Sequence, residues 1–214
     1  MITICWSAKG GSGTTVVATS LGLLANHSLL VDLAGDVATA LGLDVGDRPG
    51  VLDWIGSDAP AEHLGDLTVE VGSDTLLLPQ RPAQEQQRPS SRWDELGAWL
   101  RGWGRELDGT VVVDAGATPP PAGLLRHADR DLLVTRSCYL SLAAVRAMSH
   151  RPSGVVLLRE PGRVLRARDV SSALQVPVVA ELPYDTRVSR ALDAGLLATR
   201  MPHSLRKAAR QVAA

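Results

Sequence analysis

A glycine-rich turn near the start of the chain constrains the fold more than any other stretch. Residues 8–15 read AKGGSGTT and lie between two apolar runs, Ile2–Trp6 and residues 16–24. The first run predicts a buried strand and the second a helix. In this order, successive backbone N–H groups and a helix N-terminus point into one concavity. The sequence therefore predicts an anion site that suits a di- or triphosphate; a turn without any ligand is the alternative.

The position of the lysine distinguishes this turn, which we call the glycine loop (residues 8–15), from the standard phosphate-binding loop. The standard loop ends in Gly-Lys-Ser/Thr. Here the lysine precedes the paired glycines, which resembles the deviant-Walker ATPases of the ParA/MinD family and their pattern Lys-Gly-Gly-x-Gly-Lys-Thr-Thr. The chain departs from that pattern at Thr14, where the CpaE/TadZ branch often carries a small residue. It matches the pattern at Lys9, Gly10, Gly11, Gly13 and Thr15.

Composition indicates one domain over residues 1–214. The chain is 45% hydrophobic and has a net charge of −1, so its charge gives no general attraction to nucleic acid or anionic membranes. Two cysteines, no signal peptide and no apolar run near the roughly 20 residues of a membrane span predict a cytoplasmic protein without a transmembrane segment. Lys9 and Lys207 are the only lysines among 22 basic residues. A narrow cation against a phosphate would explain Lys9, with chance placement as the alternative.

Strand and helix patterns alternate along the chain. This alternation predicts a mostly parallel sheet with helices on both faces. The resemblance, which runs from Met1 to about Pro202, implies the three-layer α/β fold of P-loop NTPases with about seven strands. The expected strands cover residues 2–6, 28–33, 76–79, 110–114, 131–136 and 154–159, and a last strand with its exit loop covers 176–185. The expected helices cover residues 16–24, 50–55, 59–64, 93–107, 140–148, 164–174, 188–195 and 202–212.

Two segments between the strands have less obvious roles. Residues 80–92 are polar and contain two prolines, which predicts a surface loop that is functional or mobile. Trp93, Trp99 and Trp103 then recur at helical spacing. The stripe is either a binding face or a surface packed on the sheet, and we favour packing because the chain has no phenylalanine to supply bulk to the core.

Carboxylates follow two of the expected strands. In the resembled family the strand ending at Asp32 leads into Asp-x-Asp, whose second aspartate positions the attacking water; here that position is Ala34. Asp32 and Asp36 are therefore weak catalytic candidates, and Asp36 either substitutes for the missing carboxylate or caps the following helix. We favour the cap, because it needs only local geometry.

Asp114 ends the clearest buried strand and resembles the aspartate that holds Mg²⁺ through water in phosphoryl-transfer proteins. The resemblance implies that the Thr15 hydroxyl is a Mg²⁺ ligand and that Asp114 lies behind it. The backbone N–H groups of residues 11–14, including Ser12, would hold the β-phosphate. Prolines at 119–121 follow Gly116, so we expect a hinge and then a stiff segment.

The resemblance also has implications for recognition of the nucleotide base and for binding of macromolecular partners. The family reads adenine with an asparagine where this chain has Leu158, and its Pro183–Asp185 loop would lie beside the base, so base preference stays open. Arginines 163, 166 and 168 form a solvated face or, less favoured, a patch for an acidic partner or a DNA backbone. The last helix, 202–212, lacks the large apolar face of a membrane anchor.

Together these features favour an ATP- or ADP-binding protein with Mg²⁺. The resemblance implies a nucleotide-dependent homodimer in which Lys9 reaches the partner's phosphates, acting in positioning or partitioning. Thr14 and Ala34 remove two charged groups, so we expect weak or lost ATP hydrolysis. A pseudo-ATPase scaffold that acts through protein contacts is the alternative, and a ligase of the wider P-loop family ranks last.

Overall fold

The computed structural model describes residues 1–80 and 90–213. Its strands form a single sheet in the order β3-β4-β2-β5-β1-β6-β7-β8, in which the described strands are parallel except for β3, which pairs antiparallel with β4. The strands are β1 Ile2–Trp6, β2 Ser28–Asp32, β3 Val69–Glu70, β4 Thr75–Leu78, β5 Thr110–Asp114, β6 Arg130–Arg136, β7 Gly154–Arg159 and β8 Val178–Pro183.

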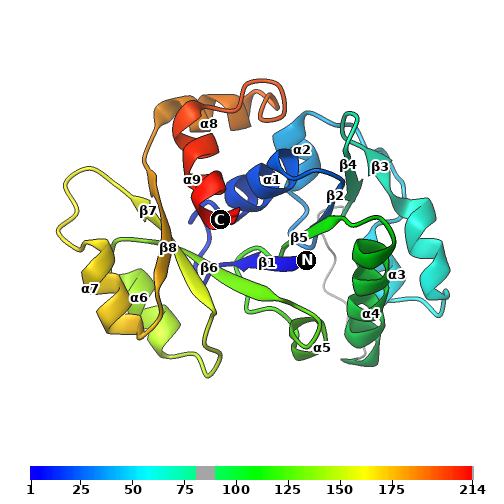
Figure 1. The fold of residues 1–214 in the computed structure, drawn as a ribbon, viewed down its shortest axis with the longest axis horizontal. Coiled ribbons are helices and arrows are strands. Elements are labelled where there is room, and N and C mark those ends of the chain that lie inside the picture. Colours follow the sequence, from blue (N-terminus) through cyan, green and yellow to red (C-terminus); the bar gives the residue numbers. More distant parts are fainter. Residues whose placement is uncertain (81–89, 214) are drawn as a thin grey trace.

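Helices cover both faces of the sheet (Figure 1). One face packs against α1, α2, α8 and α9, and the other against α3, η1, α4, α5, α6 and α7. The helices are α1 Thr14–Leu24, α2 Val37–Leu41, α3 Val51–Ile55, the 3₁₀ helix η1 Ala61–Leu67, α4 Ser90–Glu106, α5 Ala122–Leu125, α6 Tyr139–Arg146, α7 Ala167–Leu174, α8 Thr186–Asp193 and α9 His203–Ala213. The predicted three-layer α/β fold is confirmed.

The central strands are buried on both sides, which explains their continuous apolar sequences. Every residue of β1 and β2 is buried, and β5 is buried from Val111 to Asp114. Parallel strands covered by helices on both faces carry this kind of β-branched run. The described part of the chain has eight strands rather than about seven, because the two-residue strand β3 was too short and too polar to be predicted.

Several predicted boundaries shift. Helix α1 begins at Thr14, directly after the glycine loop, and α7 begins at Ala167 rather than at residue 164. The predicted helix at 59–64 is a 3₁₀ helix displaced to Ala61–Leu67. Most of the predicted loop at 80–92 lies outside the described residues, but residues 90–92 form the start of α4 and not a loop. The short helix α5 was not predicted.

The tryptophan stripe of α4 lies against the sheet. Trp93, Trp99 and Trp103 are partly buried and pack on the core cluster that includes Leu96 and Leu100. The prediction of a packed face is confirmed. Helix α9 is packed as well, since Leu205, Ala208, Ala209 and Val212 are buried. Among the described helices, none combines the length and the apolar character needed to cross a membrane.

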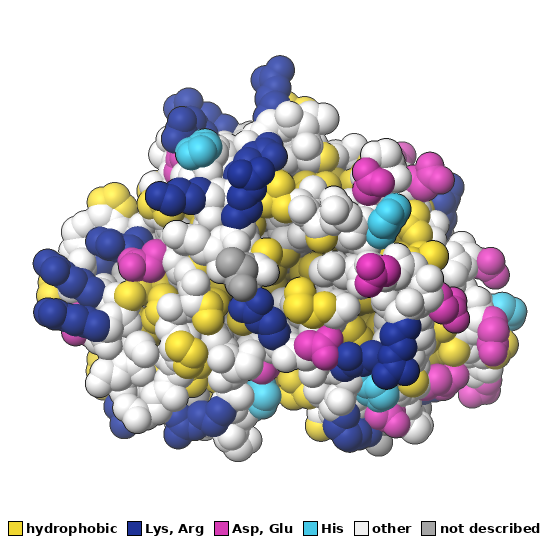
Figure 2. Space-filling model, in the orientation of Figure 1, with side chains coloured by type: hydrophobic (Ala, Val, Ile, Leu, Met, Phe, Trp, Pro, Cys, Tyr) yellow, Lys and Arg dark blue, Asp and Glu magenta, His cyan; other side chains and the backbone are white. Residues whose placement is uncertain are grey.

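Charge is distributed unevenly over the surface despite the net charge of −1. Figure 2 shows Lys and Arg side chains gathered over the region of α8 and α9 and around α7, with Asp and Glu on the side of β3 and η1. Helices α8 and α9 together contribute Arg187, Arg190, Arg206, Lys207 and Arg210. Helices α8 and α9 follow one another in the chain, and the fold places their basic side chains in one region of the surface.

Candidate functional site

The glycine loop connects β1 to α1 in a conformation that depends on its glycines. Gly11 and Gly13 have φ values of 71° and 89°, which belong to the left-handed region that side chains disfavour. The hydroxyl groups of Ser7 and Ser12 both donate to the Lys9 carbonyl oxygen, at 3.0 and 2.7 Å. A Cβ atom built on Gly13 would meet no atom within 4 Å, so the space in front of the loop is open.

A cavity of about 700 Å³ lies in front of the loop, at the carboxyl ends of the central strands. Loops that follow β1, β2 and β5 meet there, and backbone hydrogen bonds join them: Ser7 donates to Gly116 at 2.9 Å, and Leu33 donates to Asp114 at 2.8 Å. The cavity is lined by Ser7, Gly10, Gly11, Ser12, Gly13, Thr14, Thr15, Val16, Leu33, Ala34, Asp36, Thr39, Ala40, Ala115, Gly116, Ala117, Thr118, Leu192 and Asp193. Parallel α/β sheets bind ligands at this edge.

Asp114 lies fully buried at the end of β5. Its Oδ1 atom accepts a hydrogen bond from the Gly116 N–H at 3.0 Å, whereas its Oδ2 atom is buried and has no hydrogen-bond partner among the described residues. Burial raises the pKa of Asp114 to about 6, and the nearby Thr15 hydroxyl and the Gly116 N–H oppose that rise. A buried, unpaired carboxylate oxygen near a threonine hydroxyl fits a Mg²⁺ ion held partly through water.

Asp32 has a different environment, although it pairs with Asp114 across neighbouring strands. Its carboxylate accepts three backbone N–H groups, from Ala34 at 3.0 Å, Gly35 at 2.7 Å and Val37 at 2.9 Å. Burial, together with the charge of Asp114, raises the pKa of Asp32 to about 7. Asp32 therefore organises the loop after β2 and is not among the residues that line the cavity.

Asp36 corrects one prediction. It stands at the N-cap position immediately before α2, but within the described residues its side chain makes no capping hydrogen bond, so the favoured cap is wrong. The side chain is exposed and lines the cavity, close enough for its charge to raise the pKa of Asp114. Ala34 lines the cavity too, and a Cβ added to Gly116 would come within 3.1 Å of the Ala34 methyl group.

Lys9 points away from the cavity of its own chain. It is exposed and lines a second hollow of about 360 Å³ on the outer side of the loop. Its ammonium group has no ion pair with the residues that the structure describes. Tyr139 and Leu140, which line the same hollow, are 77% and 66% exposed. The outer side of the loop therefore presents an uncompensated cation next to apolar surface.

The Pro183–Asp185 loop is not among the residues along the 700 Å³ cavity. The Asp185 carboxylate caps α8 by accepting the Arg187 N–H at 2.9 Å, and it also accepts the Ser204 hydroxyl at 2.6 Å. Pro183 lines a separate hollow with Ser204. Leu192 and Asp193, at the other end of α8, reach the cavity instead, and no local pattern in the sequence singled them out.

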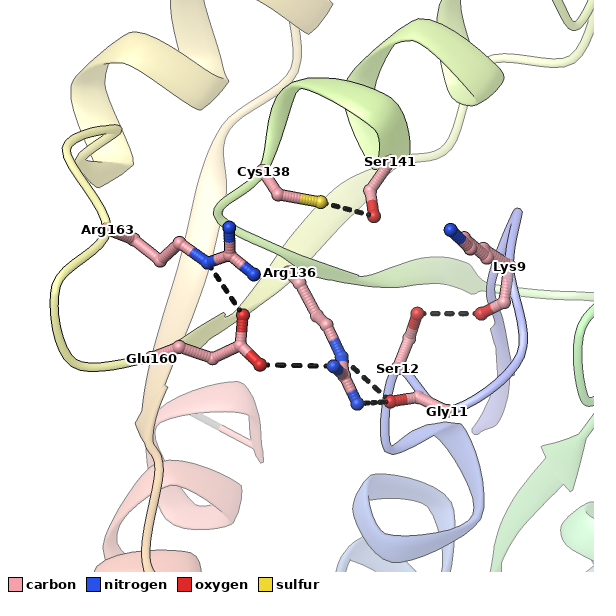
Figure 3. A network of polar contacts seen from close by, with 8 residues as sticks. All are labelled: Lys9, Gly11, Ser12, Arg136, Cys138, Ser141, Glu160 and Arg163. Carbon is pink, nitrogen blue, oxygen red and sulfur yellow. Dashed lines mark hydrogen bonds and ion pairs between the residues drawn. The ribbon is translucent and has the colours of Figure 1, made fainter.

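The predicted arginine face around residue 163 is partly neutralised. Arg163 pairs with Glu160 at 3.1 Å, and Arg168 lies 3.6 Å from Asp169. Glu160 also pairs with Arg136 at 3.0 Å, and Arg136 in turn donates to the carbonyl oxygen of Gly11 (Figure 3). No local pattern singles out Arg136, because it lies 125 residues from the loop that it contacts.

Comparison with known proteins identifies the fold. No family model matches the chain, and no curated protein matches it in sequence. MinD in the MinC:MinD cell division complex of Aquifex aeolicus is 19% identical, with a TM-score of 0.77 over 99% of this chain and 93% of that one. The septum site-determining protein MinD with Mg-ADP from Pyrococcus horikoshii is 20% identical, with a TM-score of 0.75 over 99% and 93%. A ParA family ATPase from Chlorobium tepidum is 17% identical, with a TM-score of 0.74 over 97% and 96%. The chain thus has the fold of the MinD and ParA ATPases along nearly its whole length.

Proposed function

We propose that this chain binds Mg-ATP or Mg-ADP in the 700 Å³ cavity. The observation that carries the proposal is a preformed glycine loop that opens on this cavity, with the unpaired Oδ2 atom of Asp114 buried nearby. The backbone N–H groups of residues 11–14 would hold the β-phosphate, and Thr15 and Asp114 would hold the Mg²⁺ ion, which offsets phosphate charge when bound. The MinD structure with Mg-ADP, which shares the fold, supports this assignment.

We further propose that nucleotide binding drives formation of a homodimer through the outer side of the glycine loop. Lys9 is exposed, directed away from its own cavity and unpaired within the described residues, which is the state of a cation that serves a partner's phosphates. The exposed side chains of Tyr139 and Leu140 lie on the same side and would be buried in such a dimer. Exposed apolar side chains with polar groups at their rim are typical of protein interfaces.

ATP hydrolysis in this proposal is slow or lost. Residue 14 is an uncharged threonine and residue 34 is an alanine, so neither supplies a charged group. The Asp32 carboxylate already accepts hydrogen bonds from three backbone N–H groups. Loss of one charged or donor group at a transferring phosphoryl typically costs about a hundredfold or more in rate. Asp36 lines the cavity and does not cap its helix, so its carboxylate is available to orient a water molecule.

The biological role that fits is a ParA/MinD-like positioning or partitioning protein, near the CpaE/TadZ branch because of the small residue at Thr14. A pseudo-ATPase scaffold in pilus, secretion or division positioning is the second candidate, favoured by the missing charges at Thr14 and Ala34. Binding of an acidic partner or of a DNA backbone to the arginines around α7 remains a prediction. The two candidates differ in whether nucleotide is bound and turned over.

Calorimetry with Mg-ATP and Mg-ADP, light scattering and phosphate release together test the proposal. We expect micromolar binding, a shift from monomer to dimer with ATP, and slow turnover. Lys9→Ala should abolish the dimer while the monomer still binds nucleotide. Lys207→Ala is the matched control, because it removes the other lysine, which is exposed on α9 away from the loop. No binding at millimolar ATP would reject the switch and leave the scaffold.

A further inference from the structure

Arg136, at the end of β6, reaches across to the glycine loop. Its Nε atom donates to the Gly11 carbonyl oxygen at 2.9 Å, and its Nη2 atom donates to the same oxygen (Figure 3). Both donors of the planar fork thus converge on one acceptor. Other cations lie nearby, but in the described part of the chain Arg136 is the cation that hydrogen-bonds the loop backbone.

The guanidinium is itself held in place. Its Nη1 atom pairs with Glu160 Oε1 at 3.0 Å, and the other oxygen of Glu160 pairs with Arg163 Nε at 3.1 Å. Glu160 is 17% exposed at its side chain and Arg136 38%. Salt screens a partly buried ion pair less than a fully exposed one. A guanidinium that is bonded to Gly11 on one side and to Glu160 on the other is restricted to one orientation. Residues just beyond β7 therefore anchor an arginine that reaches the loop after β1.

Fixing the Gly11 carbonyl also fixes the next N–H group. In a planar trans peptide the C=O and the following N–H point in opposite directions. With the Gly11 oxygen turned toward Arg136, the N–H of Ser12 is turned the other way. The two serine hydroxyl groups that bond the Lys9 carbonyl act similarly on the N–H of Gly10. Gly11 has a left-handed φ of 71°, so this orientation would otherwise depend on a flexible glycine.

The charge of Arg136 matters as well, because the loop has little of its own. Between Ser7 and Val16 the only charged side chain is Lys9. Lys9 and Arg136 both line the outer hollow rather than the cavity, so the charge of Arg136 acts on the ligand through the loop backbone to which it is bonded. Arg136 is bonded to the loop backbone, and a Cβ on Gly11 would lie 3.4 Å from its Nη2 atom. Fixed positive charge and preorganised N–H donors are the two features that bind phosphate groups.

We propose that Arg136 is a positioning residue for phosphate binding: anchored by Glu160, it clamps the Gly11 carbonyl so that the loop N–H groups face the cavity, and it supplies the loop with a fixed positive charge. The proposal rests on the nucleotide binding proposed above. It implies that the β7–α7 segment, through Glu160 and Arg163, tunes phosphate affinity without touching the ligand.

The test compares variants in calorimetry with Mg-ADP and with Mg-pyrophosphate, which probes the phosphate site alone. Arg136→Gln should weaken both ligands about tenfold, as expected for the loss of a partly exposed charge-assisted clamp. Arg136→Lys keeps the charge without the fork and should recover part of the loss. The thermal unfolding midpoint of the free protein should stay close to wild type, which separates positioning from a general loss of structure.

Two further variants make the result specific. Arg159→Gln is the matched control, because Arg159 lies on the neighbouring strand and pairs with Glu181 at 3.2 Å without contacting the loop; its affinity should equal wild type. Glu160→Gln should weaken binding about threefold, and the double variant with Arg136→Gln should bind no worse than Arg136→Gln alone, because both act through one clamp. If Arg136→Gln does not fold, Glu160→Gln tests the clamp in its place.

Different outcomes reject different statements. If wild type binds both ligands and Arg136→Gln binds within twofold of it, the clamp is rejected while the nucleotide site stands. If Arg159→Gln loses as much affinity as Arg136→Gln, a general positive field and not the clamp accounts for the effect. If wild type binds neither ligand at millimolar concentration, the proposed function fails and the role of Arg136 fails with it.

Discussion

At the residue scale, the two aspartates at the ends of β2 and β5 show how one residue type takes two roles. The oxygens of Asp32 accept three backbone N–H groups, whereas the Oδ2 atom of Asp114 is buried without a partner in the part of the chain that the structure describes. A buried polar atom without a partner costs stability, and such atoms concentrate where a ligand completes them. Asp114 is therefore the carboxylate whose environment suits a metal, and Asp32 the one that shapes the loop.

The unpaired oxygen of Asp114 predicts a gain in stability when its charge is removed. Asp114→Asn should raise the free energy of unfolding of the nucleotide-free protein at pH 8 by about 1–2 kcal/mol, because burial disfavours the charged form. Chemical denaturation measures this. The same variant should weaken Mg-nucleotide binding at least tenfold, so a more stable protein would bind less well. A loss of stability at pH 8 would contradict this account of Asp114.

The sign of the pH dependence follows from the raised pKa values. Asp114 and Asp32 titrate at about 6 and 7 in the folded protein and near 3.8 when unfolded. The folded state holds these protons more tightly, so their contribution to stability is full below about pH 4 and is lost as the pH rises through 6–7. Asp114→Asn should flatten this dependence. Asp94→Asn is a control of opposite sign, because hydrogen bonds from His127 and Arg126 lower the pKa of Asp94.

Thr14 gives a prediction of the opposite kind, a gain of binding. Thr14 is the first residue of α1 and lines the cavity, so a lysine in its place would extend toward the proposed phosphate site. Thr14→Lys should raise the affinity for Mg-ADP about tenfold and leave the affinity for adenosine unchanged, since adenosine carries no phosphate. Calorimetry with both ligands checks this. An unchanged affinity for Mg-ADP would reject the present account of the glycine loop.

At the element scale, helices α2 and α8 are each preceded by an aspartate at the N-cap position, and of the two only Asp185 caps its helix with its side chain. Asp185 accepts the N–H of Arg187 at the start of α8, while Asp36 at the start of α2 accepts none. The difference is where each side chain is turned: Asp185 also meets Ser204 of α9, and Asp36 lines the cavity. The same residue type at the same helix position thus serves structure in one helix and is available to a ligand in the other.

This contrast predicts opposite effects of two alanine substitutions. Asp185→Ala should lower the free energy of unfolding, because a helix cap is lost, with little effect on nucleotide affinity. Asp36→Ala should leave stability within about 0.5 kcal/mol and reduce whatever slow phosphate release the protein shows. Denaturation curves and phosphate release measure both. A large loss of ADP affinity in Asp185→Ala would instead restore Asp185 to the base-binding role that the resemblance implies.

At the scale of the whole molecule, strand order creates the cavity. Strand β5 lies between β1 and β2, so the loops that follow these three strands emerge side by side at one edge of the sheet. The strand β6 lies on the other side of β1, which brings Arg136 next to the glycine loop. Segments from the first and the middle thirds of the chain therefore share one site.

Much of this arrangement was predictable from local pattern. The apolar runs of β1, β2 and β5 and the glycine loop specify buried strands, a turn and a helix start by dihedral preference and burial alone, which are properties of neighbouring residues. Boundaries were less predictable, because propensity does not mark where packing ends: α7 begins three residues later than expected, and residue 164 is left exposed.

The sequence by itself determined the glycine loop, the alternating α/β pattern and the carboxylates at the strand ends, because each follows from spacing and local conformation. The tertiary structure alone decided what those groups do. Asp36 lines the cavity and does not cap its helix, and the Asp32 carboxylate accepts backbone N–H groups. One oxygen of Asp114 is buried without a partner among the described residues, and Arg136 donates to the Gly11 carbonyl oxygen. The physical reason is that a side chain's partners are set by which strands are neighbours, and chain order does not state sheet order.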